Sequence, residues 1–177
     1  MNEYIISDLY RICGNTSVKS FLKTYIGNST FRFQVALRLR NGGGLENFLG
    51  KVLWQFSKAR YSIKISPNTR IGYGLYIGHG GPIVVNSTAV IGDNVNLSQF
   101  TTIGANEGEA AVIGDNTYIG PGCCIVENVR IGHNVTIGAG TVVVKDIPDN
   151  ATAVGNYARV INYNSPGRFI KNRWVRD

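Results

Sequence analysis

The chain contains two histidines, and one of them stands where a regular pattern is interrupted. His79 lies in the segment Gly78-His-Gly-Gly-Pro82, and the glycines beside it let another molecule approach the imidazole closely. An imidazole, whose ordinary pKa is about 6.5, can take the proton of a hydroxyl group at neutral pH. His133 occupies an ordinary position of the same pattern, so we expect it to be exposed and without a chemical role. His79 is therefore the candidate general base.

The interrupted pattern is a six-residue repeat that runs from Ile65 to Val143. Each repeat begins with an aliphatic residue, usually followed by Gly, and has a small residue four places later. Twelve of the thirteen starting residues are Ile or Val, a regularity that chance composition does not explain. Such a period predicts a solenoid, with three repeats forming about one turn of a triangular β-coil. The aliphatic residues and the small residues should face the interior, and Gly, Asn and Asp should occupy corners that need a positive φ. The small residues are Thr69, Ala89, Thr101, Cys123 and Thr141.

The repeat divides the chain into three expected segments. Residues 1–60 should be helical, with one helix ending at Gly14 and the next beginning after Ser17. Residues 61–162 should form the solenoid, and residues 163–177 a basic C-terminal tail. The solenoid pattern has two insertions, one of two residues after His79 and one of four residues within Ala105–Val112. Insertions in a regular coil are where functional groups tend to lie.

The net charge of +7 is concentrated in the two flanks of the repeat. Residues 1–64 hold ten basic and three acidic residues, and residues 145–177 hold six and three. The excess indicates a solvated surface, a phosphate-bearing ligand, or an anionic membrane contacted by Arg32, Arg38 and Arg40. Nucleic acid is not expected, because no pattern of stacking aromatic and basic residues accompanies the charge.

The chain has no features of an exported or membrane-spanning protein. No apolar run approaches about 18 residues, and the N-terminus lacks a signal-peptide pattern. Its three cysteines have no spacing typical of a disulfide framework or a metal site. We therefore expect a cytoplasmic protein, with peripheral contact at the inner face of the membrane left open.

Residues 77–104 resemble the most diagnostic stretch of the serine acetyltransferase branch of the hexapeptide-repeat acyltransferases, and residues 142–161 resemble that family's last coil. The resemblance implies an all-β fold, a left-handed parallel β-helix, with a short helical N-terminal segment. It also implies a homotrimer with active sites between subunits, acetyl-CoA as co-substrate without a metal, and His79 as general base.

Three positions depart from that family. The Asp that precedes the base histidine is Gly78 here, a second Asp that orients the histidine aligns with Lys64, and residues 105–111 lack the His and Arg that hold the amino acid. A serine acceptor needs charged partners. We therefore expect the hydroxyl of a sugar or surface-polysaccharide precursor as acceptor, as in the shorter polysaccharide O-acetyltransferases. L-Serine is the alternative, and a non-catalytic trimeric scaffold a remote one. A zinc hydratase needs three histidine ligands, and the chain has two.

The same resemblance suggests further site residues. Lys145 and Arg159 match positions near the phosphates of CoA, and Tyr157 is a candidate to pack on its adenine. Glu107 or Glu109 is a candidate to supply the carboxylate that His79 lacks. The pantetheine arm would follow small residues on the coil edge, and two amides would orient the acceptor: these are Gly104, Gly120, Gly138 and Ala139, and Asn86 and Gln99.

Overall fold

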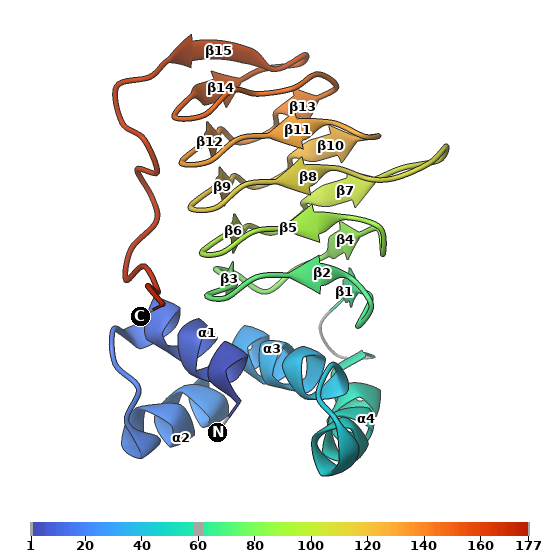
Figure 1. Cartoon of the computed structure of the whole chain (residues 1–177), viewed down its shortest axis with the longest axis vertical. Helices are drawn as coiled ribbons and strands as arrows, with labels where there is room; N and C mark the ends of the chain where they lie inside the picture. Colours follow the sequence, from blue (N-terminus) through green and yellow to red (C-terminus); the bar gives the residue numbers. More distant parts are fainter. Residues whose placement is uncertain (1, 59–61, 177) are drawn as a thin grey trace.

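The structure, a computed structural model, describes residues 2–58 and 62–176 (Figure 1). Four helices lie at one end of a solenoid: α1 (Glu3–Cys13), α2 (Val18–Gly27), α3 (Ser29–Arg40) and α4 (Gly44–Lys58). The predicted helix signals are confirmed at two places. Gly14 ends α1 in the left-handed conformation, with φ 71° and its N–H donating to the Tyr10 carbonyl. The Ser17 side chain begins α2 by accepting from the Ser20 N–H.

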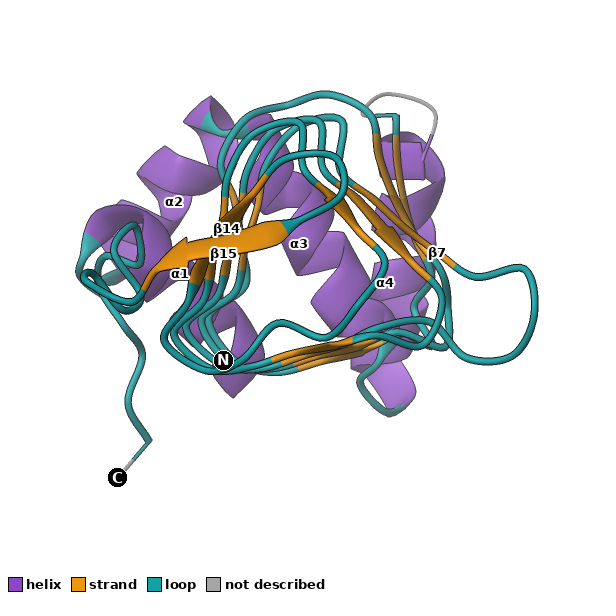
Figure 2. Ribbon diagram, turned by 90° about the horizontal axis from the view of Figure 1, so that it is seen from above, coloured by secondary structure: helices purple, strands orange, loops and turns teal. Residues whose placement is uncertain are grey.

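The remaining elements form three sheets that enclose a triangular interior (Figure 2). Neighbouring strands are parallel, except that the last two are antiparallel and close the far end of the coil. This arrangement confirms the predicted left-handed parallel β-helix of six-residue repeats. The first sheet contains β1 (Ile63–Ile65), β4 (Ile83–Val85), β7 (Thr102–Gly104), β10 (Cys124–Val126) and β13 (Val142–Val143). The second contains β2 (Arg70–Ile71), β5 (Val90–Ile91), β8 (Val112–Ile113) and β11 (Arg130–Ile131). The third contains β3 (Tyr76–Ile77), β6 (Asn96–Leu97), β9 (Tyr118–Ile119), β12 (Thr136–Ile137), β14 (Thr152–Val154) and β15 (Arg159–Asn162).

The repeat positions behave as the pattern predicts. The five small residues are 2% exposed or less, and every aliphatic starting residue is buried except Ile71, which is half-buried in the first coil. Asparagines at successive corners, among them Asn116 and Asn134, adopt φ values near 55°, which Asn tolerates better than most residues. Burial raises the pKa of the Cys123 thiol, so this residue acts as a small apolar side chain.

Helix α3 covers the open edge of the first coil with a stripe of hydrogen-bond donors. The Thr30 hydroxyl donates to the Ile77 carbonyl at 2.9 Å, and the Gln34 amide donates to the Leu75 carbonyl at 2.6 Å. One turn further on, Arg38 donates to the carbonyls of Ile71 and Gly72 at 2.9 and 2.7 Å. These donors are spaced four residues apart, so they lie on one face of the helix. The stripe satisfies backbone carbonyls that have no preceding coil to accept from.

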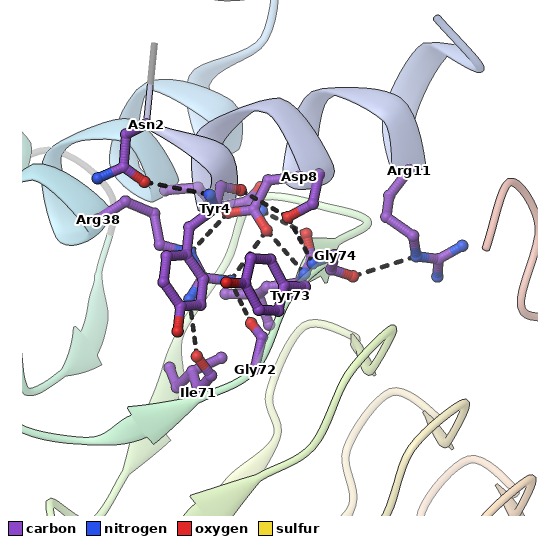
Figure 3. A network of polar contacts seen from close by, with 12 residues as sticks. Asn2, Tyr4, Asp8, Arg11, Arg38, Ile71, Gly72, Tyr73 and Gly74 are labelled. Atoms are coloured by element: carbon purple, nitrogen blue, oxygen red, sulfur yellow. Dashed lines mark hydrogen bonds and ion pairs between the residues drawn. The ribbon is translucent and has the colours of Figure 1, made fainter. Parts of the chain in front are cut away.

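Helix α1 completes this cap through Asp8, as Figure 3 shows. The Asp8 carboxylate pairs with Arg38 through two bonds of 2.9 Å and accepts the Leu75 N–H at 2.8 Å. Both side chains are almost fully buried. Desolvation raises the pKa of Asp8, whereas the Arg38 guanidinium and the Leu75 N–H favour its ionised form. The pair therefore ties two helices and the first coil together at one point.

The C-terminal tail runs back along the third sheet towards α1 (Figure 1). The Asn94 side chain exchanges two hydrogen bonds with the backbone of Trp174, at 2.7 and 2.9 Å. The Trp174 and Tyr10 rings form a T-shaped pair, with centroids 5.7 Å apart. The tail is thus fixed to both the coil and the helical end.

The expected membrane contact through Arg32, Arg38 and Arg40 is wrong for Arg38. Its guanidinium is buried against Asp8 because the first coil needs its donors, so it cannot face a lipid surface. Arg32 donates to the Tyr25 and Ile26 carbonyls at the end of α2. Among the described residues, no helix combines the length and apolar character needed to cross a bilayer.

Asp8→Asn should destabilise the fold by about 3–5 kcal/mol, because it leaves the Arg38 charge buried without a counter-charge. The free energy of unfolding, measured in denaturant, checks this. Asp93→Asn is the matched control: Asp93 pairs with Arg176 at 3.3 Å with side chains 26% and 59% exposed, and Asn keeps the acceptor for the Tyr73 N–H. We expect a loss below about 1 kcal/mol there. Equal losses in the two variants would contradict the role given to the Asp8–Arg38 pair.

Candidate functional site

His79 lies at the corner where β3 passes to β4, and its side chain is exposed. The two inserted residues fold this corner against the next coil. A side chain at Gly81 would place its Cβ 3.0 Å from the Cβ of Gln99, and Gly81 has a φ of 153°. Glycine is therefore required at this position for the corner to approach the coil.

A cavity of about 440 Å³ opens beside His79. It is formed by four parts of the chain: α1, the first two coils at β3 and β6, and the C-terminal tail. None of the eight described residues that line it is acidic, so the lining within one chain supplies no carboxylate to orient His79. The lining residues are Arg11, Ile12, Tyr76, His79, Asn96, Phe169, Lys171 and Asn172.

Gly78 and Lys64 stand at the two positions where an Asp was expected from the resemblance, and the structure gives each a different surrounding. A Cβ at Gly78 would lie 3.1 Å from the Tyr76 ring, so this glycine leaves room for the ring that lines the cavity. Lys64 lies on the exposed face of β1. Glu107 and Glu109 are exposed at the corner between β7 and β8, which joins the first and second sheets, whereas His79 joins the third and first. Within one chain, these glutamates therefore do not meet His79.

Three of the suggested donor-site residues come together at the far end of the coil. Lys145, Tyr157 and Arg159 line a cavity of about 290 Å³ together with Val144 and Ala158. All three side chains are exposed. Two cations beside an exposed aromatic ring suit the phosphates and base of a nucleotide.

The four small residues suggested for the coil edge differ in their surroundings. Gly120 is buried, and a Cβ there would lie 2.8 Å from the Ile137 carbonyl oxygen, so the stacking of coils itself requires this glycine. A Cβ at Gly138 would press on Val154, at 2.7 Å. Ala139 is exposed, and Gly104 lines a third cavity, of about 470 Å³.

The two amides suggested for the acceptor are also separated. Asn86 accepts from the Thr88 N–H and donates to the Ala105 carbonyl, so it holds the turn beside the 105–111 loop. Gln99 packs against Gly81 on the corner that carries His79, and its buried Oε1 has no hydrogen-bond partner in the described part of the chain. Of the two, Gln99 lies beside the candidate base.

His133 belongs to a ladder of stacked corners. Its Nδ1 accepts the Asp115 N–H at 3.0 Å, and its own N–H donates to Asp149 at 2.8 Å. In the coil before, Asp115 accepts the Asp93 N–H in the same way. His133 thus takes the place of a corner Asp, which accounts for it without a chemical role.

Sequence reasoning missed Arg11 and Lys171 as neighbours of His79. Both lie outside the repeats, and each appeared only in the count of charge on a flank. No spacing in the sequence connects α1 or the tail with the coil that carries His79, because the tail's return along the third sheet is a tertiary feature.

Comparison with known proteins identifies the family that shares this fold. Residues 110–145 match the family model described as bacterial transferase hexapeptide (six repeats). The chain resembles soybean serine acetyltransferase complexed with serine, with 31% identity over 89% of this chain and 68% of that one and a TM-score of 0.72. The chain belongs to the hexapeptide-repeat acyltransferases. Among curated members, a Staphylococcus aureus serine acetyltransferase is 35% identical over 71% of this chain and 57% of its own length.

These relatives are all serine acetyltransferases, and they are longer than the chain. The chain spans about half the length of the serine acetyltransferases of Synechococcus elongatus and S. aureus, 47% and 57%. Another solved neighbour, a serine acetyltransferase in complex with CoA, is 25% identical, with a TM-score of 0.72 over 89% of this chain and 68% of that one.

The expectation of a sugar or polysaccharide acceptor is therefore wrong, as is the resemblance to polysaccharide O-acetyltransferases. The relatives and structural neighbours are serine acetyltransferases. The expectation rested on the partners absent at positions 64, 78 and 105–111. It took no account of α1 and the tail, which bring other polar side chains to the same cavity.

Proposed function

We propose that the protein is an O-acetyltransferase that moves the acetyl group of acetyl-CoA to the hydroxyl of L-serine. The observation that carries this proposal is an exposed histidine, set among glycines at an interrupted corner, in a coil that matches serine acetyltransferases along most of this chain. Solved neighbours in complex with serine and with CoA support both substrates.

In the proposed reaction, His79 accepts the hydroxyl proton as the serine oxygen attacks the thioester carbonyl. The new C–O bond forms as the C–S bond breaks, and the imidazolium returns its proton to the departing thiolate. Backbone N–H groups at the corner would stabilise the negative oxygen that develops on the carbonyl. Acceptor and donor bind together, so no covalent acyl-enzyme is needed.

The separation of the two cavities suits this pair of substrates. His79 follows β3, and the cavity of Lys145, Tyr157 and Arg159 lies beyond β14, four strand spacings away in the third sheet. At about 4.8 Å per spacing, the two sites are roughly 19 Å apart along the coil axis, and the extended pantetheine arm of CoA would run in this direction. The phosphates would bind at the far cavity while the thioester reaches His79.

A homotrimer would complete the site between subunits. Phe100, at 61% exposure, and the exposed Val84 flank the corner of His79 and offer apolar surface for a neighbouring subunit. The 105–111 loop projects from another corner of the triangle, so in a trimer it is free to reach an adjacent chain. Glu107 is then the candidate carboxylate for the serine ammonium or for His79.

The purified protein should release CoA thiol from acetyl-CoA when L-serine is present. We expect kcat/KM for serine at or above about 10⁴ M⁻¹s⁻¹, the low end of ordinary enzyme efficiency. Threonine and ethanolamine, which alter the side chain or lack the carboxylate, are the comparison acceptors. Thiol release that does not depend on serine would refute the proposal.

His79→Ala should lower kcat by about 10²–10⁴-fold and leave the fold intact, because the exposed side chain acts as the base and packs against little. Circular dichroism and the same thiol assay check both parts. His133→Ala is the matched control and should keep near-normal turnover. Normal turnover in His79→Ala would rule out this histidine as the base.

Replacing Lys145 and Arg159 together with Ala should raise KM for acetyl-CoA about 10-fold and KM for serine less, with a difference that shrinks at high salt. Arg130→Ala removes an exposed arginine from the second sheet and serves as control. Salt-independent or equal effects on both substrates would argue against phosphate binding at this cavity.

A further inference from the structure

Arg11 is a buried cation whose hydrogen-bond partners, within the described residues, are all neutral. Its residue is 4% exposed, its Nε donates to the Gly74 carbonyl at 3.1 Å, and its Nη2 donates to the Asn96 side chain. In the part of the chain that the structure describes, no carboxylate lies within ion-pair distance of this guanidinium, and Nη1 makes no hydrogen bond. Arg38, by contrast, forms an ion pair with the Asp8 carboxylate.

This guanidinium keeps its charge in the folded protein. Burial lowers the pKa of Arg11 to about 10; Arg173 acts in the same direction, whereas Tyr76 and the Asp8 carboxylate act against it. A group with that pKa is still protonated at neutral pH. The guanidinium lies over the Tyr76 ring at 5.8 Å, but no described carboxylate contacts it directly. A buried, protonated guanidinium without a carboxylate in contact favours an anionic ligand beside it, because the ligand supplies that contact.

Arg11 is aimed into the cavity of His79. Figure 3 shows its side chain leaving α1 away from the Asp8–Arg38 pair, and it lines the cavity together with His79 and Lys171. Lys171 approaches from the C-terminal tail and is exposed, so the cavity has one buried cation and one exposed cation.

The tail is held so that Lys171 stays at this place. On one side of it, the Phe169 carbonyl accepts from Asn96 at 3.3 Å. On the other side, the Asn172 side chain donates to the Arg11 carbonyl at 3.4 Å. The same Asn96 therefore joins the tail, the coil and Arg11. Such fixed anchors reduce the ordering cost of binding.

We propose that Arg11 and Lys171 bind the carboxylate of the acceptor and thereby place its hydroxyl against His79. The inference rests on the proposed function and names the groups that recognise its substrate. In serine, two carbon atoms separate the carboxylate carbon from the hydroxyl oxygen, so one cavity can hold both. Because residues 105–111 contain neither His nor Arg, the carboxylate needs cations from elsewhere, and α1 and the tail supply them.

The test compares L-serine with L-serinamide, which keeps the hydroxyl and amino groups but lacks the carboxylate. The wild-type protein should prefer serine. Lys171→Ala should raise KM for serine about 10-fold, change kcat less than about 2-fold, and reduce the preference over serinamide by a similar factor. Lys171→Arg should restore most of it. Arg176→Ala removes another tail cation, one that pairs with Asp93 at 3.3 Å and does not line the cavity, and should change neither value.

Arg11→Lys is the second variant, because Ala at this buried position could prevent folding. It keeps the charge but loses the planar pair of donors, so KM for serine should rise while KM for acetyl-CoA stays unchanged. Unchanged serine KM and serinamide preference in both variants would overturn the inference and leave the proposed function standing. A rise in KM for acetyl-CoA alone would also overturn it, assigning these cations to the phosphates of the donor. Failure of the wild-type protein to acetylate serine would instead refute the proposed function.

Discussion

The first coil of a solenoid has backbone carbonyls that no earlier coil can bond, and the rest of this structure depends on how they are satisfied. Helix α3 meets them with Thr30, Gln34 and Arg38, four residues apart. An open edge of this kind otherwise invites pairing with another chain. The cost of burying the Arg38 charge is offset by Asp8, which also accepts a backbone N–H of the coil. One ion pair thus lets two helices end the coil without leaving an edge exposed.

The cap also determines where the candidate site can form. His79 lies on the coil that the helices cover, so α1 is within reach of its corner, whereas the helices described here lie away from the later coils (Figure 1). The tail returns along the third sheet to the same end and is fixed there by Asn94 and Asn96. The cavity beside His79 therefore combines residues from both ends of the chain. A bare β-coil, with flat faces and periodic corners, would offer no such enclosure.

The features that depend on local pattern could be predicted from the sequence. The six-residue period indicated the coil, its buried aliphatic and small residues and its corner asparagines, and the break in that period singled out His79. The six-residue period could not reveal the role of α3. In this helix Phe31, Phe33, Val35 and Leu37 alternate with other residues as in a strand, and this alternation obscures the buried polar residues that bond the first coil. Nor could it connect Lys171 with His79, since the contact depends on the path of the tail. The acceptor was misjudged for the same reason: absent partners were counted at aligned positions, while partners from other elements were not visible.

Three cations of the flanks show why a formal charge count says little about function. Arg38 is buried and neutralised, so it contributes to the fold and not to the surface. Arg176 pairs with Asp93 in solvent, where the interaction is weak and screened. Arg11 is buried like Arg38 but has only neutral partners among the described residues, so its field remains available to a ligand in the cavity beside it. What separates these residues is the pairing and solvation that the fold gives each of them. Of the three, Arg11 is the cation whose burial most needs a ligand to explain it, because desolvation of a charge is costly and a bound carboxylate would offset that cost.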